Sequence, residues 1–191
     1  MTTESKLPTV LLLMLTGIVL LLMVAIIGLF VRMNQVQGAV LAALAASPAG
    51  ATMQDVGLEV GTPAPAFILP NLDGAPISPA DFAGRRVLLI FSSVSCPACT
   101  EMYPHLRDFS EAHRQVQVVM VSRGAAGENR ALVEGQGFAF PVLTWEDGVA
   151  QAYGVPGTPF CYVVDEAGVI VGKGFANTRA QLEALVESRA E

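Results

Sequence analysis

The chain has 191 residues, enough for one domain of ordinary size and an extension. Hydrophobic residues make up 52% of the sequence and the mean hydropathy is +0.52, which is too apolar for a simple soluble protein and prompts a search for a membrane segment. The formal net charge is −6, and no basic run or interleaving of basic and aromatic residues occurs, which argues against nucleic acid as a partner.

An uncharged apolar stretch runs from Leu7 to Val31, between Lys6 and Arg32. As a helix its 25 residues would span about 37 Å, enough to cross a lipid bilayer with some tilt. A cleaved signal peptide is the alternative, but its apolar region normally has about 7–15 residues. We therefore predict a cytoplasmic N-terminus over residues 1–6 and a retained transmembrane anchor over residues 7–31.

The stretch after the anchor is rich in alanine, and Ser47 to Gly50 should break any helix there. We expect a linker over residues 32–55 and one globular domain over residues 56–191. At the start of this domain, Ala66 to Leu69 suggest a short edge strand, and Asn71 to Gly74 form a turn signal. Residues 79–84 form another break before the central strand.

The centre of the domain is the stretch from Val87 to Pro104. Its apolar run from Val87 to Phe91 predicts a buried strand, and Ser92 to Ser95 predict a polar turn. Cys96-Pro97-Ala98-Cys99 then opens a predicted helix whose apolar residues recur at helical spacing, and which should end near His113. The helix dipole and the free N–H groups of the first turn stabilise a thiolate, so this pair of cysteines is suited to thiol–disulfide exchange.

Half of a zinc site is the alternative for the two cysteines. Zinc normally takes four ligands, and the chain otherwise offers Cys161, His105 and His113, none of them in a paired-ligand spacing. The context of strand followed by helix therefore favours redox chemistry, with no metal. The two histidines are interpreted as surface or capping residues of the helix, and Pro104 should kink it.

Strands and helices alternate through the rest of the domain. Strands are predicted at 116–122, 138–143, 160–165 and 169–173, and helices at 128–136 and 146–153. Thr178 to Gln181 match a capping box that opens a final helix. This order predicts an α/β domain with a mixed sheet. Cys161 falls inside a strand, where we expect a small buried hydrophobic residue.

Two features resemble the thioredoxin superfamily: a proline eight residues after the first cysteine, Pro104, and the sequence Gly157-Thr158-Pro159 before a strand. The resemblance implies a thioredoxin-like fold in which Pro159 is cis and faces the cysteine pair. It also implies that the Thr158 backbone pairs with an extended client segment. Taken alone, Thr-Pro would be interpreted as an ordinary turn; together with the cysteine pair it favours a binding role.

The segment Pro63 to Phe67 and the strand-and-helix insertion between Ser122 and Pro156 resemble the TlpA/ResA branch, whose members are membrane-anchored and extracytoplasmic. The N-terminal anchor, the Cys-Pro-x-Cys centre and the ending Lys173 to Glu183 are similar to the MauD type of methylamine utilisation protein. That type is associated with disulfide formation or isomerisation in the small subunit of methylamine dehydrogenase. The resemblance implies a periplasmic domain, cysteine-containing client proteins and a separate redox partner that reloads the pair.

The sequence departs from this pattern at two places. Ser95 replaces the tryptophan that often precedes the first cysteine, and Ile90 replaces the buried acid of thioredoxin. Proton transfer at Cys99 must therefore use water or another carboxylate. Because Pro97-Ala98 provides no cation beside Cys96, a very strong oxidant is disfavoured.

We expect Cys96 to react as the thiolate and Cys99, one turn deeper, to resolve the mixed disulfide. Thr158 and Pro159 should contact the client, while Pro97, Ala98 and Pro104 support the site. No cofactor is expected beyond the redox-active disulfide between the two cysteines. One alternative is a peroxiredoxin-like peroxidase, whose motif would need proline and threonine or serine where Ser92 and Cys96 stand. The other is a copper-delivery module, which normally has one more residue between its cysteines.

Overall fold

The computed structural model describes residues 15, 17, 20–23 and 56–187. Backbone contacts divide the chain into two units, Met1–Gly50 and Ala51–Glu191. In the first unit the described residues 15, 17 and 20–23 are helical, and their large apolar side chains are exposed. No helix within the described ranges is long and apolar enough to cross a membrane. The remainder of the predicted N-terminus, anchor and linker over residues 1–55 lies outside the described residues.

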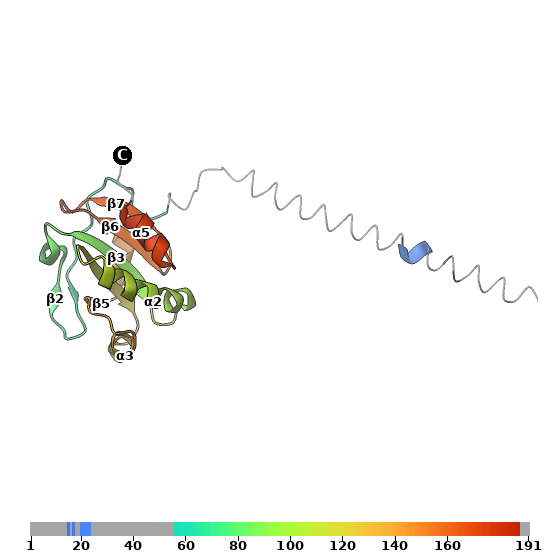
Figure 1. Cartoon of the computed structure of the whole chain (residues 1–191), viewed down its shortest axis with the longest axis horizontal. Coiled ribbons are helices and arrows are strands. Elements are labelled where there is room, and N and C mark those ends of the chain that lie inside the picture. Colours follow the sequence, from blue (N-terminus) through green and yellow to red (C-terminus); the bar gives the residue numbers. More distant parts are fainter. Residues whose placement is uncertain (1–14, 16, 18–19, 24–55, 188–191) are drawn as a thin grey trace, which may run out of the picture. The chain divides into compact units, whose positions relative to one another are not determined.

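The domain is built on a five-stranded sheet in the order β5-β4-β3-β6-β7 (Figure 1). Its central strand, β3, runs parallel to β4, and β4 runs parallel to β5. β6 pairs antiparallel with β3, and β7 antiparallel with β6. The strands are β3 (Arg86–Ser93), β4 (Val116–Arg123), β5 (Val142–Thr144), β6 (Phe160–Val164) and β7 (Ile170–Gly174). The mixed sheet confirms the predicted α/β class.

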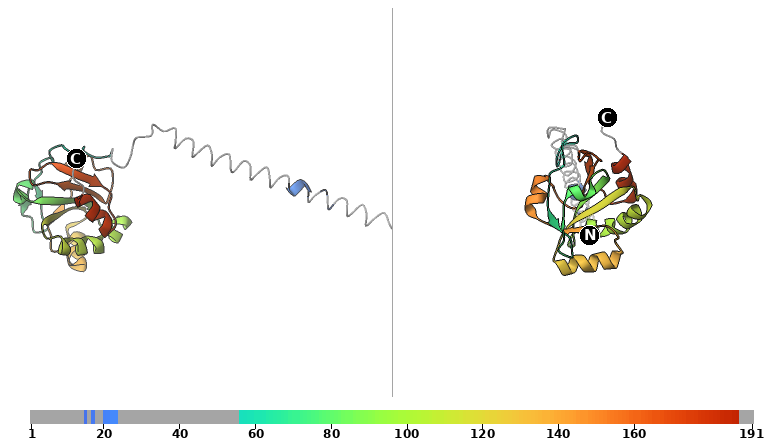
Figure 2. Two further views of the ribbon diagram at one scale, coloured as in Figure 1. Left: turned by 45° about the horizontal axis from the view of Figure 1, so that its top comes forward. Right: turned by 90° about the vertical axis from the view of Figure 1, so that its left-hand side faces the viewer.

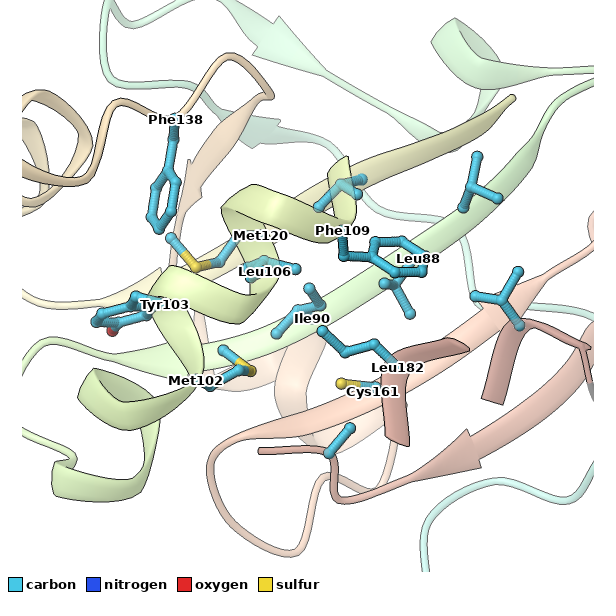
Figure 3. Close-up of a cluster of buried hydrophobic side chains, with 14 of the residues drawn as sticks. Leu88, Ile90, Met102, Tyr103, Leu106, Phe109, Met120, Phe138, Cys161 and Leu182 are labelled. Atoms are coloured by element: carbon cyan, nitrogen blue, oxygen red, sulfur yellow. The ribbon is translucent and has the colours of Figure 1, made fainter. Parts of the chain in front are cut away.

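One face of the sheet is covered by α2 (Pro97–Ala112), α3 (Ala126–Gln136) and α5 (Arg179–Glu187). Figure 3 shows α2 laying Met102, Leu106 and Phe109 onto this face, which we call the α2 face. From the sheet, Leu88 and Ile90 of β3 meet these side chains, and all five are fully buried. The apolar spacing along α2 therefore fixes which side of the helix meets the sheet.

The opposite face, here called the distal face, is covered by α4 (Asp147–Ala152), the 3-10 turn η1 (Pro79–Phe82) and the segment that precedes it. Leu89 and Phe91 point this way because side chains alternate along a strand. The Phe91 ring packs against Tyr153, Tyr162 and Trp145, with centroid separations of 5.3, 6.3 and 5.7 Å. Figure 2 shows the sheet between its two helical layers from two further directions.

The segment before β3 runs along both edges of the sheet. Beside β7, the Gly61 N–H donates to the Ile170 carbonyl at 2.7 Å, and the Ile170 N–H donates to the Thr62 carbonyl at 2.9 Å. Beside β5, Asn71 bridges to Leu143. Asn71 begins the turn of a small hairpin formed by β1 (Leu69–Pro70) and β2 (Pro76–Ile77). Both outer strands thus have partners from the same chain.

Several predicted boundaries differ from the structure. Ser92 and Ser93 continue β3 instead of forming the turn, because their backbones pair with Ser122 and Arg123 of β4. The strand predicted at 138–143 is confined to Val142–Thr144. The edge strand predicted at 66–69 is a two-residue pair beginning at Leu69. The remaining strands and helices agree with prediction to within about two residues at each end, as expected for such boundaries.

The capping box at the start of α5 is confirmed. The Thr178 N–H donates to Oε1 of Gln181 at 3.1 Å, and the Gln181 N–H donates to Oγ1 of Thr178 at 3.4 Å. α2 contains Pro104 without interruption from Pro97 to Ala112, and His113 is its C-cap.

Candidate active site

Cys96 is the N-cap of α2, and its sulfur fills the role usually taken by an oxygen. Its backbone is extended, with φ −93° and ψ 115°, and its Sγ accepts a hydrogen bond from the Cys99 N–H at 3.2 Å. Pro97 occupies the first turn, where a missing N–H costs nothing. Cys96 is partly exposed and Cys99 is fully buried, and all three cysteines of the chain are unpaired. The two thiols therefore differ in access, as predicted.

The loop before β6 lies against Cys96. The Thr158–Pro159 peptide is cis, as the resemblance implied. The Cys96 thiol donates to the Thr158 carbonyl at 3.3 Å, across 62 residues of sequence. The fold thus brings the predicted thiols and the predicted client-binding loop into direct contact. Pro159 is buried and Thr158 is partly exposed.

Two opposing effects act on the Cys96 thiol. Burial raises its pKa, but hydrogen bonds from the Cys99 thiol and the Thr158 side chain lower it. The backbone N–H groups of Cys99 and Ala98, at the start of the helix, lower it further. The hydrogen bonds prevail, so the pKa of Cys96 lies below its ordinary value.

The other two thiols shift in the opposite direction. Burial raises the pKa of Cys99, and the hydrogen bond that it gives to Cys96 raises it further. Burial also raises the pKa of Cys161 to about 12. Because thiolates are the reactive form, these shifts favour reaction at Cys96 over the two buried thiols. The burial of Cys161 inside β6 confirms the predicted small buried residue.

A pair of buried hydroxyls beside Cys99 was missed from the sequence. The Ser92 and Tyr103 hydroxyls lie 2.9 Å apart, and Tyr103 donates to the Ser93 carbonyl at 3.2 Å. The Ser92 side chain acts on Cys99 to lower its pKa, although burial outweighs it. No carboxylate is among the groups that shift the pKa of Cys99 in the part of the chain described here. Hydroxyls therefore lie beside Cys99, where the sequence predicts water or another carboxylate.

A groove opens beside Cys96 at the ends of β3, β4 and β5. One wall carries Arg123, whose guanidinium lies 4.4 Å from the centroid of the Trp145 ring and 2.8 Å from Oδ1 of Asp147. The Trp145 indole also donates to that carboxylate oxygen at 2.8 Å. The groove is lined by Ser93, Ser95, Cys96, Arg123, Trp145, Val155, Pro156, Gly157 and Thr158. The parallel strands β3, β4 and β5 bring Ser93, Arg123 and Trp145 to this edge, and the loop before β6 adds residues 155–158. Nothing in the spacing of Arg123 and Trp145 predicts their place beside Cys96.

The two histidines lie away from the thiols. His105 is exposed on α2. The His113 ring stacks on Phe109 at 4.4 Å, and its Nε2 lies 3.8 Å from a Glu183 carboxylate oxygen. Among the residues described, no three His, Cys, Asp or Glu side chains gather in a way that could hold a metal ion.

The chain is similar in sequence to several known proteins. Residues 60–173 match the AhpC/TSA family. The methylamine utilization protein MauD of Paracoccus denitrificans is 37% identical over 146 residues, covering 74% of this chain and 72% of MauD. A shorter match is to MT2597 of Mycobacterium tuberculosis, a protein whose name assigns it to the peroxiredoxins. It is 36% identical over 132 residues, and the match covers 60% of this chain and 83% of that protein.

Among solved structures, a secreted Mycobacterium tuberculosis disulfide oxidoreductase homologous to E. coli DsbE superposes with a TM-score of 0.57 at 25% identity. The alignment covers 63% of this chain and 93% of that chain. The similarity therefore extends over nearly the whole of that chain.

Proposed function

The chain belongs to the AhpC/TSA family, with a thioredoxin-like fold and MauD proteins among its relatives, and from this we propose that it is a thiol–disulfide oxidoreductase acting through Cys96 and Cys99 on cysteine-containing client proteins. The observation that carries the proposal is the contrast between the two thiols. Cys96 caps the helix with a lowered pKa and partial exposure, whereas Cys99 is buried with a raised pKa.

The reductive direction takes two displacements. The Cys96 thiolate attacks a client disulfide, one client sulfur leaves as a thiolate, and a mixed disulfide joins Cys96 to the client. Cys99 then loses its proton and attacks Cys96, which closes the Cys96–Cys99 disulfide and releases the second client thiolate. That thiolate takes up one proton. Oxidation of a client is the reverse sequence, and it consumes the protein disulfide.

The environment of Cys96 bears on which direction is favoured. Hydrogen bonds that stabilise its thiolate stabilise the reduced protein and make the disulfide a better oxidant. Those bonds come from neutral groups, the Cys99 thiol, the Thr158 side chain and backbone N–H groups. A neutral donor stabilises a thiolate less than a positively charged donor would, so the Cys96–Cys99 disulfide should be a moderate oxidant.

The loop before β6 is the proposed docking place for the client backbone. Thr158 is in contact with Cys96 and lines the groove beside it. An extended client segment that pairs with the Thr158 backbone would place its cysteine beside the partly exposed Cys96. Strand-like pairing of this kind recognises backbone and therefore accepts clients of varied sequence.

Location and client are part of the same proposal. The uncharged span over residues 7–31 would anchor the chain in a membrane, with the thiol domain on the periplasmic side, where disulfides persist. Relatives named for methylamine utilization make the maturation of methylamine dehydrogenase the proposed setting. A reporter fused after Glu191 should be active outside the cytoplasm, and activity of a cytoplasm-restricted reporter would contradict this orientation.

Trapping of intermediates tests the chemistry in the full-length chain. Cys99→Ala should accumulate mixed disulfides between Cys96 and clients on non-reducing gels, because the resolving thiol is gone. Cys96→Ala should accumulate few, because Cys99 is fully buried. Cys161→Ala is the matched control and should behave as the wild type. Adducts on Cys99, or stoichiometric zinc on the untouched pair, would refute the assignment.

Peroxide reduction is the second candidate, favoured by the family match and by the relative assigned to the peroxiredoxins. Ser92 and Cys96 stand where the peroxiredoxin motif would need proline and threonine or serine. In that motif the reactive cysteine would be Cys99. The purified protein should therefore consume hydrogen peroxide no faster than Cys99→Ala does, and rapid, Cys99-dependent turnover of peroxide would make this second activity the principal one.

A further inference from the structure

The alternation of β3 and the turns of α2 bring three polar side chains to one place. Ser92 lies two residues beyond Ile90, so its side chain points to the α2 face. On α2, Cys99 and Tyr103 are four residues apart and lie on the same side of the helix. Figure 3 shows Tyr103 next to Met102 on α2, at the margin of the apolar cluster. The hydroxyls of Ser92 and Tyr103 therefore lie at the buried end of the thiol site.

Both hydroxyls are removed from solvent, with Ser92 0% and Tyr103 2% exposed. Each carries one proton, which limits the bonds that they can make together. Tyr103 donates to the Ser93 carbonyl at 3.2 Å, and Ser92 can then donate across 2.9 Å to the Tyr103 oxygen. In this arrangement the Ser92 hydroxyl can accept a hydrogen bond from the Cys99 thiol but cannot donate one to the thiolate.

A second arrangement uses the same atoms. Ser92 turns its proton away from Tyr103, and Tyr103 donates to the Ser92 oxygen in place of the Ser93 carbonyl. Both changes are rotations about C–O bonds and move no heavy atom. We propose that this hydroxyl pair positions a hydrogen bond on the Cys99 thiolate during resolution, in the role that a buried carboxylate plays elsewhere, with Ser92 and Tyr103 as positioning residues. The inference rests on the proposed function, since it concerns the second displacement.

The pair stabilises the thiolate and does not take its proton. Burial raises the pKa of Tyr103 to about 12, so its hydroxyl stays protonated at neutral pH and can act as a donor. The proton lost from Cys99 is balanced by the one that the departing client thiolate takes up. Besides this pair, the titratable groups that act on Cys99 or are acted on by it are Cys96 on α2 and Cys161 on β6. Neither is a carboxylate.

The exchange of the reduced protein with the small disulfide DTNB separates the two displacements. A first thionitrobenzoate is released when Cys96 attacks, and a second when Cys99 resolves. Ser92→Ala should slow the second release roughly tenfold at neutral pH and move its pH midpoint upward by about one unit, while the first release is unchanged. Tyr103→Phe should act in the same direction with a smaller change, because Ser92 keeps its proton.

Two further variants complete the design. Ser92→Thr keeps the hydroxyl and should restore the second release. Ser122→Ala is the matched control: Ser122 pairs with Ser92 in register, is equally buried, and its hydroxyl has no hydrogen-bond partner among the described residues. It should leave both releases unchanged. Unfolding in urea, measured on each variant, confirms that the compared proteins are folded.

The outcomes distinguish this inference from the proposed function. A wild type that releases no second thionitrobenzoate would overturn both. A wild type that releases two, with a folded Ser92→Ala whose second release keeps its rate and pH midpoint, would overturn the hydroxyl pair alone. Equal slowing by Ser122→Ala, or slowing of both releases by Ser92→Ala, would also overturn it, because it would indicate a general disturbance of the site.

Discussion

All three tyrosines of the chain are buried, but on opposite faces of the sheet and with different partners. On the distal face, Tyr153 donates to the Pro65 carbonyl at 2.8 Å, and Tyr162 donates to the Tyr153 carbonyl and accepts from the Leu58 N–H. On the α2 face, one partner of Tyr103 is another hydroxyl, that of Ser92. Main-chain partners have fixed directions, whereas a hydroxyl can rotate. The tyrosines of the distal face therefore have fixed hydrogen bonds, while the Ser92–Tyr103 pair on the α2 face can reorient when the charge on Cys99 changes.

The largest effect is expected from the distal face. Leu89→Ala removes a buried side chain that packs between β3 and the distal helix layer, and it should lower the free energy of unfolding by about 2–5 kcal/mol. The first and second release of thionitrobenzoate from DTNB should keep their rates when measured on folded protein, at urea concentrations well below the unfolding midpoint. A changed second release with a modest loss of stability would show that the two faces are not separable.

A smaller effect on the same face follows from one oxygen. Tyr162→Phe leaves the Tyr153 carbonyl without its donor and the Leu58 N–H without its acceptor, so stability should fall by about 1–3 kcal/mol. Equilibrium urea unfolding measures the loss, and DTNB kinetics should be unaltered. If the second release of thionitrobenzoate instead slowed by the amount expected for Tyr103→Phe, the proposed difference in role between Tyr162 and Tyr103 would be wrong.

Cys161 tests the α2 face away from the hydroxyl pair. Cys161→Ala removes one buried sulfur and should cost about 1 kcal/mol with no change in exchange. Its folded pKa of about 12 lies above the ordinary 9.0, so its contribution to stability is present below pH 9 and is lost as pH rises towards 12. The wild type should therefore lose stability more steeply than the variant in that range, as urea midpoints at successive pH values would record.

The smallest change concerns Thr158. Thr158→Ala keeps the carbonyl that accepts from Cys96 but removes the side chain that lowers its pKa. In a Cys99→Ala background, alkylation of Cys96 by iodoacetamide at neutral pH should slow by less than about tenfold, with its pH midpoint raised by under one unit. An unchanged pH midpoint would mean that the helix N–H groups, and not the Thr158 side chain, stabilise the Cys96 thiolate.

The sequence predicted the strand and the helix that carry the two cysteines well because their signals are local. The apolar run of β3, the cysteines at the start of α2 and the capping box of α5 each lie within a few neighbouring residues. The polarity of Ser92 predicts a turn, although the backbone pairing with β4 keeps this residue in the strand. Its contact with Tyr103 depends on how α2 is placed on β3, which no local pattern records.

The segment before β3 was predictable only in part. Its turn at Asn71 to Gly74 is confirmed, since the Gly74 N–H donates to the Asn71 carbonyl at 3.0 Å. The strands β1 and β2 have two residues each and contain prolines, so neither alternation nor β propensity identifies them. Their position depends on tertiary pairing along β5 and β7, which is set by the completed sheet.

That pairing has a consequence for how the protein survives its own chemistry. An exchange enzyme meets partly unfolded chains whose exposed strands add readily to open sheet edges, a common first step in aggregation. Here Thr62 and Gly61 accompany β7, and Asn71 bridges to β5, so a foreign strand would first have to displace them. In the proposed mechanism a client instead meets the loop at Thr158, beside Cys96, and the disulfide that joins it to Cys96 is a bond that the enzyme itself can break.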